Sequence, residues 1–250
     1  FRYGQPEKIG GWDKVTSDAL LGSTRAILTW SDLNGVNYAM YGTNKKLYSY
    51  SEGSYGDITP TRGTGSITQF ATTNASTTVT VTDADHGCLI GDHVTISSVS
   101  ADVGGITQAN LQNEFEIQTA TDDNTYTIVS PAAASSTTTG STATATYEIN
   151  SGPAVSIYGY GWGASVWDST GDSDKGTWNN TREGLTGAQA VKLKSENWSL
   201  DNWGEDVLIQ KFDGGIYYWD TSSGLSSNVA ATTSVSNGPT KSRLMMVSGD

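Results

Sequence analysis

The feature that most constrains the fold is the way glycine separates short apolar runs. The chain has 250 residues, with 29 glycines and only 5 prolines, and glycine pairs stand at 10–11, 104–105 and 214–215. Glycine adopts the positive φ angles of tight turns without steric cost, so this spacing is typical of hairpins. Helical spacing of apolar residues is nearly absent. We therefore predict an all-β fold of many short antiparallel strands.

Residues 1–63 form the first of three parts that differ in composition. Apolar and polar residues alternate at 25–30, 37–41 and 46–50, which predicts strands. The connectors at 32–35 and 42–45 carry the Asn and Gly residues that hairpin loops favour. Consecutive strands are therefore expected to pair as a meander.

Residues 64–150 form the second part, which contains no tryptophan and is dominated by Thr, Ser, Ala and Val. Alternation with period two predicts strands at 77–82, 93–96, 114–117 and 124–128, and a closing strand follows the polar loop at 135–141. We expect a small sandwich or barrel of roughly five or six strands, each with one face buried. The change in composition indicates a separate, inserted domain.

Residues 151–250 form the third part, which is again rich in tryptophan and repeats the first. An apolar strand, a polar turn and an aromatic strand occur at 38–50 and again at 207–219. Repeated hairpins of this kind are typical of propeller blades, which bury both faces of each sheet against their neighbours. We predict a propeller-like framework interrupted by the second part, whose two ends must then lie close together. Another apolar strand begins at 245–250, so we expect the framework to continue beyond it.

Net charge and hydropathy exclude several classes of function. The formal charge is −12, from 14 basic and 26 acidic residues, whereas affinity for nucleic acid comes largely from Lys and Arg that neutralise phosphates. A surface that grips DNA is therefore not expected. An acidic wall along which DNA slides fits the charge, and so does ordinary solubility, which we favour. No apolar run is long enough for a membrane span.

The two histidines of the chain, His86 and His93, lie within seven residues of each other. They stand beside further residues that bind metals or act in catalysis, namely Asp83, Asp85, Cys88 and Asp92. The cluster fits a metal site, but Asp and Gly also occur at strand-to-turn junctions for conformational reasons. We favour the turn interpretation. The single cysteine cannot form an intramolecular disulfide.

Other acidic groups give weaker indications of chemistry. The loop 168–176 is rich in oxygen ligands but lacks the spacing of an EF-hand. Glu205, Asp206 and Asp201 offer carboxylates for glycoside hydrolysis, although the sequence does not fix their separation. No phosphate-binding glycine loop is present. We expect no catalytic residue, no cofactor and no metal ion.

The segment 158–167 interleaves aromatic residues with glycine. Exposed rings of this kind stack on sugars in carbohydrate-binding modules, and they also pack between blades or between subunits. We favour packing. The candidate packing or subunit-interface aromatics are Tyr158, Tyr160, Trp162, Trp167, Trp203 and Trp219.

The order of several segments along the chain resembles a family of tail proteins from tailed bacteriophages. These segments are 1–12 (FRYGQPEKIGGW), 47–48 (LY), 55–60 (YGDITP), 124–128 (NTYTI), 161–163 (GWG), 202–206 (NWGED) and 214–219 (GGIYYW). Together they extend over nearly the whole chain. The layout of a propeller with an insertion is similar to the nozzle, or tail-tube, proteins of short-tailed phages.

The resemblance implies a structural protein of the virion tail and not an enzyme. Nozzle proteins form a hexameric ring below the portal and adaptor, carry fibre attachment sites and enclose the channel through which DNA leaves. The expected partners are therefore copies of this chain, the portal or adaptor, the tail fibres and, passively, the exiting DNA. The alternative left open is a carbohydrate-binding or depolymerising protein of the tail tip.

Overall fold

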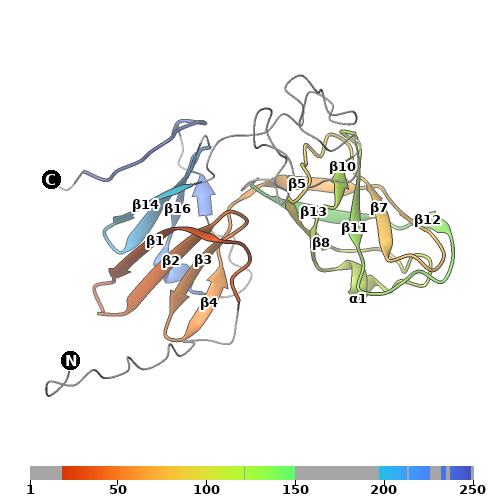
Figure 1. The fold of residues 1–250 in the computed structure, drawn as a ribbon, viewed down its shortest axis with the longest axis horizontal. Helices are drawn as coiled ribbons and strands as arrows, with labels where there is room; N and C mark the ends of the chain where they lie inside the picture. The colour runs from red at the N-terminus through yellow and green to blue at the C-terminus, as the bar shows by residue number, and fades with distance from the viewer. Residues whose placement is uncertain are drawn as a thin grey trace, which may run out of the picture.

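The computed structural model confirms an all-β fold. It describes residues 19–120, 122–149, 197–212, 214–225, 232–234 and 237–248. These residues form four antiparallel sheets, one helical turn, α1 (Gln108–Leu111), and one 3-10 turn, η2 (Thr221–Ser223). Two sheets make up the framework and two make up the insert (Figure 1). None of the helices in these ranges is long and apolar enough to cross a membrane.

The first framework sheet is the predicted meander. Its strands β1 (Thr24–Ser31), β2 (Asn37–Thr43), β3 (Leu47–Ser51) and β4 (Ser54–Asp57) pair in chain order. The predicted turn at 32–35 is held by Asp32, whose Oδ1 accepts hydrogen bonds from the amides of Asn34 and Val36 at 2.9 and 2.8 Å. Gly35 has a φ of 81°, which a residue with a Cβ rarely adopts.

The second framework sheet repeats the first. Its strands β14 (Trp198–Trp203), β15 (Asp206–Lys211), β16 (Ile216–Trp219) and β17 (Thr232–Ser234) also pair in chain order. The sequence repeat between 38–50 and 207–219 corresponds to β2 and β3 in one sheet and to β15 and β16 in the other, the middle two strands in each case. The repeat is therefore structural. A four-stranded meander is the unit of a propeller blade, and closure into a propeller stays a prediction.

Aromatic residues join the two framework sheets. Trp30 stacks on Tyr38, with ring centroids 5.3 Å apart, and meets Trp219 edge-on at 6.0 Å. Trp198 lies over Gly42 of β2, where an added Cβ would be 2.4 Å from the indole, and its Nε1 donates to the Thr43 carbonyl at 2.7 Å. The shared core consists of Trp30, Met40, Leu47, Ile58, Ile149, Trp198, Val207, Ile209 and Trp219.

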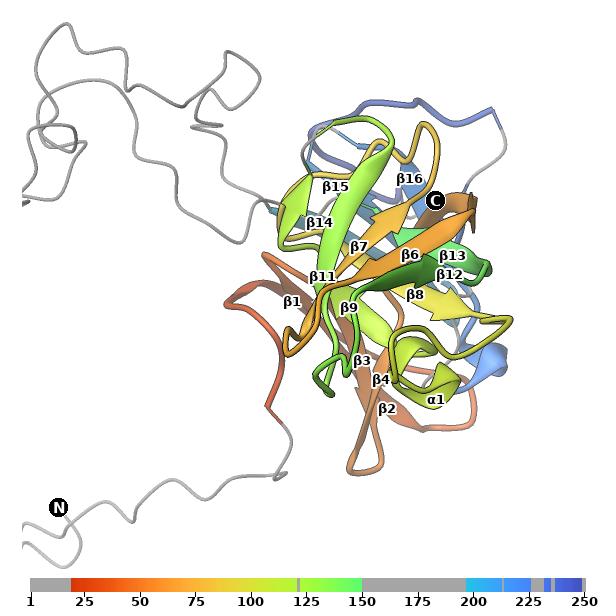
Figure 2. The same cartoon turned by 90° about the vertical axis from the view of Figure 1, so that its right-hand side faces the viewer.

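The insert is a sandwich of two sheets. One has the order β10-β11-β7-β6-β12 and the other β5-β13-β8-β9. Figure 2 looks at the insert with the framework behind it. Its strands are β5 (Thr61–Ile67), β6 (Gln69–Thr72), β7 (Thr78–Thr82), β8 (His93–Ser97), β9 (Glu114–Glu116), β10 (Thr119–Ala120), β11 (Thr125–Val129), β12 (Thr138–Gly140) and β13 (Ala143–Glu148).

The core of the insert is separate from that of the framework and is mostly aliphatic. Val79 and Val81 on β7 face Ile128 and Tyr126 on β11, and all four are fully buried. The insert enters by β5 and leaves by β13, and these two strands pair, with Thr61 opposite Glu148. The two ends of the insert therefore lie together, as an insertion into a framework loop requires.

The predicted strands of the insert are confirmed, whereas several short ones were missed. The structure has β5 to β13 where alternation indicated roughly five or six strands. β10 and β12 have two and three residues, too few for alternation to be recognised. β5 has the sequence TRGTGSI, whose glycines suggest a loop. Pairing with β13 along its length makes this segment a strand.

Candidate functional site at the junction of framework and insert

The predicted histidine cluster divides into two places. His86 lies inside the insert, where its Nδ1 accepts from the Cys88 amide at 2.9 Å and its ring meets Tyr126 edge-on. Arg62 donates to the His86 carbonyl at 2.7 Å. The carboxylate of Asp83 accepts from the Tyr147 hydroxyl at 2.5 Å. These contacts support the turn interpretation for this half of the cluster.

Burial keeps the cysteine of this network in its thiol form. Cys88 is 5% exposed, and burial raises its pKa to about 12 despite the nearby Arg62 guanidinium. Nucleophilic cysteines act as thiolates. Cys88 is therefore a packing residue, and its Sγ accepts a hydrogen bond from Arg62 at 3.0 Å.

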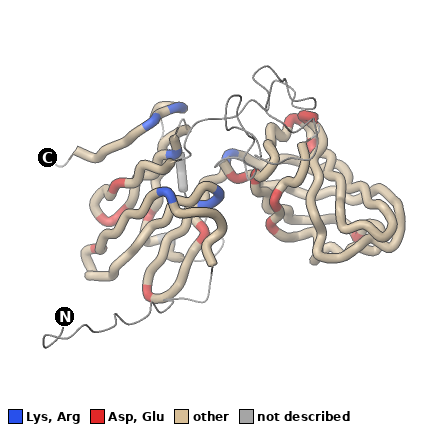
Figure 3. The backbone as a smooth tube through the Cα atoms, viewed as in Figure 1, with Lys and Arg blue, Asp and Glu red and all other residues tan. Residues whose placement is uncertain are grey.

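The charged residues between positions 63 and 149 of the insert are all acidic. Residues 63–149 contain no Lys or Arg. They contain nine acids, which are Asp83, Asp85, Asp92, Asp102, Glu114, Glu116, Asp122, Asp123 and Glu148. The basic residues described by the structure lie on the framework and at the junction (Figure 3). The cations that neutralise acids of the insert are therefore supplied across the junction.

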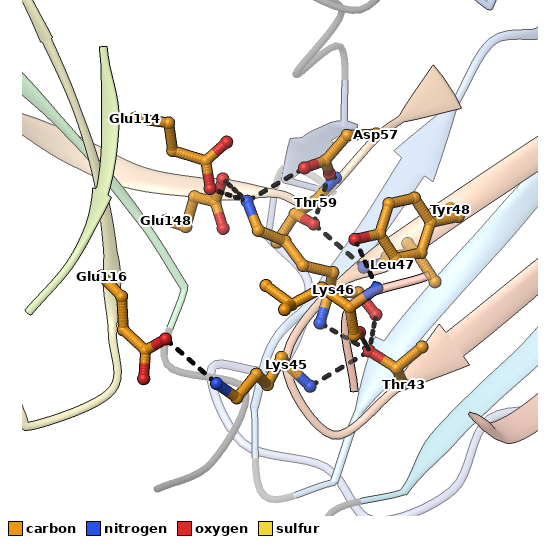
Figure 4. A network of polar contacts seen from close by, with 11 residues as sticks. Thr43, Lys45, Lys46, Leu47, Tyr48, Asp57, Thr59, Glu114, Glu116 and Glu148 are labelled. Atoms are coloured by element: carbon orange, nitrogen blue, oxygen red, sulfur yellow. Dashed lines mark hydrogen bonds and ion pairs between the residues drawn. The ribbon is translucent and has the colours of Figure 1, made fainter. Parts of the chain in front are cut away.

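Lys46 is the central cation of the junction (Figure 4). It stands in the turn before β3, its side chain is 2% exposed, and its ammonium contacts three carboxylates. Asp57 of the framework is 2.9 Å away and Glu148 of the insert is 2.5 Å away, with Glu114 as the third partner. Lys45, the preceding residue, pairs with Glu116 of β9 at 3.1 Å. Two adjacent lysines thus join the framework to the insert.

Local hydrogen bonds fix the position of Lys46. The Thr43 hydroxyl accepts from the Lys46 amide and donates to its carbonyl, at 2.8 and 2.9 Å. Thr59 accepts from the Leu47 amide and donates to Asp57. The backbone on both sides of the lysine is therefore held by contacts that do not involve its ammonium group.

Burial and charge act in opposite directions on these ionisable groups. Burial raises the pKa of Glu148 to about 8; the Lys46 charge opposes this rise, and the charges of Asp57 and Glu114 add to it. For Lys46, burial lowers the pKa, but the charges of Glu148, Asp57 and Glu114 outweigh it and the pKa is raised. The lysine therefore carries its positive charge in the folded protein.

His93, the other histidine of the cluster, faces this junction. It begins β8 and is 6% exposed. One ligand atom from each of His93, Glu114 and Glu148 lies within 4.8 Å of the others. The sequence singled out His93 but not its neighbours here, because the two glutamates stand in alternating strands where outward-facing polar residues are ordinary.

The carboxylates considered for glycoside hydrolysis are all engaged in structural contacts. Asp201 accepts from the Val247 amide at 2.7 Å, and Asp206 accepts from the Tyr218 hydroxyl and the Thr221 amide. Glu205 Oε1 accepts from the Leu33 amide at 2.9 Å, and its carbonyl accepts from Trp30 Nε1 at 3.0 Å. These acids hold turns together.

The predicted interface aromatics fall into three groups. Trp219 is fully buried between the framework sheets. Trp203 is 60% exposed at the end of β14, beside the tip of the β1–β2 hairpin, where Leu33 is 91% exposed. Tyr158, Tyr160, Trp162 and Trp167, together with the loop 168–176, lie outside the described residues.

Comparison with known proteins gives few matches. No protein-family model matches the chain, and no curated protein matches it. Four chains of solved structures match, and one of them is the phage phi92 endosialidase, with 14% sequence identity and a TM-score of 0.30 over 83% of this chain. The chain spans 29% of the length of that endosialidase chain. A likeness at this level establishes neither a shared fold nor a shared activity.

Proposed function

We propose that this chain is a structural protein of a phage tail, a ring-forming nozzle or tail-tube component. In this role it encloses the DNA exit channel and contacts the adaptor and the fibres. The proposal combines the motif order of the sequence with one structural observation, the exposed apolar side chains at adjacent hairpin tips of the framework.

The two hairpin tips present Leu33 and Trp203 to solvent, 91% and 60% exposed. Glu205 ties the tips together, because it receives hydrogen bonds from Trp30 and Leu33 of the other hairpin. Exposed apolar side chains that lie side by side on a surface favour a site of protein interaction, and aromatic residues supply much of the energy of interfaces. The tips therefore fit a contact with a neighbouring subunit.

The charge distribution supports passive contact with DNA. The insert has no Lys or Arg between residues 63 and 149, and the chain as a whole carries a formal charge of −12. Such a surface repels phosphates, so DNA passes without being held. This fits a wall of a conduit and does not fit a protein that packages or grips DNA.

The molar mass of the purified protein and of a tip variant tests the proposal. We expect a closed oligomer by light scattering coupled to size exclusion, and a shift to monomer when Leu33→Ser and Trp203→Ser are combined. The control combines Leu89→Ser and Val129→Ser, which change apolar residues of the insert that are 49% and 48% exposed. A folded wild-type monomer that is also absent from virions would refute the proposal.

A carbohydrate-binding or depolymerising tail-tip protein is the second candidate. The exposed indole of Trp203 favours it, because aromatic rings with one free face stack on sugars. A glycan array and a reducing-sugar assay separate the candidates. Binding that Trp203→Ser abolishes supports the second function, and silence in both assays with intact folding removes it.

A further inference from the structure

The cluster of His93, Glu114 and Glu148 has a ligand chemistry that the proposed function does not use. The three residues come from adjacent strands of one insert sheet, His93 from β8, Glu114 from β9 and Glu148 from β13. Their nearest ligand atoms, one nitrogen and two oxygens, all lie within 4.8 Å of one another. Backbone pairing of the three strands holds them in this arrangement.

One imidazole nitrogen and two carboxylate oxygens form a ligand set for a divalent transition metal such as Zn²⁺. Ligand atoms around tetrahedral zinc are about 3.4 Å apart, given bonds of about 2.1 Å. The cluster must therefore contract by up to about 1.4 Å to hold the ion. Glu114 has the freedom for this movement, because its side chain is 41% exposed.

One buried polar atom of the cluster lacks a hydrogen-bond partner in the described part of the chain. Glu148 is 9% exposed, and its Oε2 is buried without a hydrogen-bond partner in the same part of the chain. A buried polar atom without a partner is unfavourable. A metal ion bound to Glu148 would satisfy this oxygen.

The charge balance also favours a second cation. Within the described residues, four carboxyl groups, those of Asp57, Glu114, Glu116 and Glu148, contact two ammonium groups, those of Lys45 and Lys46.

We propose that His93, Glu114 and Glu148 form a site for one divalent transition-metal ion, and that this ion and the Lys46 ammonium are alternative cations in the same place. The lysine contacts the same two carboxylates that the metal needs. Because a divalent ion carries twice the charge of an ammonium group, it compensates the carboxylates more fully.

Competition with Lys46 has a structural consequence. When the ion binds Glu114 and Glu148, Lys46 keeps its pair with Asp57, which belongs to the same framework sheet. The ion pairs from Lys46 to the insert are then lost, and Lys45 with Glu116 is the ion pair left between the two parts in the described chain. Metal binding thus strengthens the insert sheet and loosens its attachment to the framework.

Calorimetric titration of the full chain with Zn²⁺, after treatment with a chelator, tests the site. We expect one equivalent to bind, and Co²⁺ in its place to give the visible absorption of a nitrogen and oxygen ligand set. Lys46→Met removes the competing cation and keeps the apolar stem, so the affinity should rise at least about tenfold. His93→Gln and Glu114→Gln should each lower it at least about tenfold.

Glu116→Gln is the matched control, because it removes the same charge from the same strand without removing a ligand atom. Its affinity should stay within about threefold of the wild type. Glu114 is exposed enough that its variant tests the site even if His93→Gln does not fold. Absence of Zn²⁺ binding to both wild type and Lys46→Met overturns the proposal, and so does an equal loss in Glu114→Gln and Glu116→Gln. Metal binding in this titration does not depend on ring assembly. The result therefore tests the metal site separately from the proposed function.

Discussion

The framework and the insert both pack two sheets against each other, but they use different residues to do so. The framework joins sheets from distant parts of the chain, and Trp30 meets Trp219 across its core. The insert closes on itself between Thr61 and Glu148, and its core is mainly valine, isoleucine and alanine. Large rings bury more area per residue than aliphatic side chains. The comparison teaches that tryptophan is concentrated where few residues must hold distant segments together.

The largest expected effect comes from removing the shared tryptophan of the framework. Trp219→Ala deletes a fully buried ring that contacts Trp30 and Tyr38, and such truncations cost about 3–5 kcal/mol. Urea unfolding followed by tryptophan fluorescence reports on the chain outside the insert, because no tryptophan lies in residues 64–150. We expect a large fall in the midpoint of this transition.

The matched change in the insert is Phe70→Ala, which also removes a fully buried ring. Hydrogen exchange of peptides from β7 and β11 follows the insert. If the two cores are independent, Trp219→Ala leaves this exchange unchanged and Phe70→Ala leaves the fluorescence transition unchanged. Parallel loss in both readouts for either variant would show that the molecule unfolds as one cooperative unit.

The second prediction concerns the junction that connects the two parts. Lys46→Met leaves Glu148 buried without its cation, and breaking a buried ion pair by removing one partner costs about 3 kcal/mol. The cost is placed at the lower end because Asp57 and Glu114 are partly exposed, at 27% and 41%. Urea unfolding in the presence of a chelator measures it. A change below about 1 kcal/mol would mean that the carboxylates regain solvent when the lysine is removed.

The third prediction concerns the close approach of the two framework sheets. Gly42→Ala places a methyl group 2.4 Å from the Trp198 ring, and overpacking of this kind costs about 1–3 kcal/mol. The urea midpoint of the fluorescence transition should therefore fall. The control is Gly215→Ala, next to β16 in the framework, where an added Cβ meets only the Pro239 carbonyl oxygen at 3.8 Å. Equal effects of the two changes would show that the loss of a glycine, and not the Trp198 contact, decides the result.

Sequence patterns predicted the fold well where alternation was strong. The strands at 25–30, 37–41 and 77–82 correspond to β1, β2 and β7, and the repeat at 38–50 and 207–219 corresponds to equivalent hairpins. The failures lie in strands without alternating side chains. β5 is a strand because β13 pairs with it, and such long-range pairing leaves no signal in the local sequence.

The junction was harder to predict than the fold. Lys46 follows a predicted turn at 42–45, where a lysine is expected to be solvated, and yet its side chain is 2% exposed. Its partners Glu114 and Glu148 stand 68 and 102 residues further along the chain. The charge asymmetry of residues 63–149 was a usable signal, because an acidic segment without Lys or Arg needs cations from elsewhere.

The smallest loss of stability is expected for Lys45→Met. This variant is the most direct comparison for Lys46→Met, because the two lysines are adjacent in the chain. Both lysines bridge framework and insert, but the Lys45–Glu116 pair has side chains that are 17% and 33% exposed. Partly solvated pairs contribute only about 0.5 kcal/mol and weaken further with salt. We expect urea unfolding to show a loss of unfolding free energy of this size at low salt and no loss at high salt. A loss equal to that of Lys46→Met would mean that the number of ion pairs across the junction matters more than their burial.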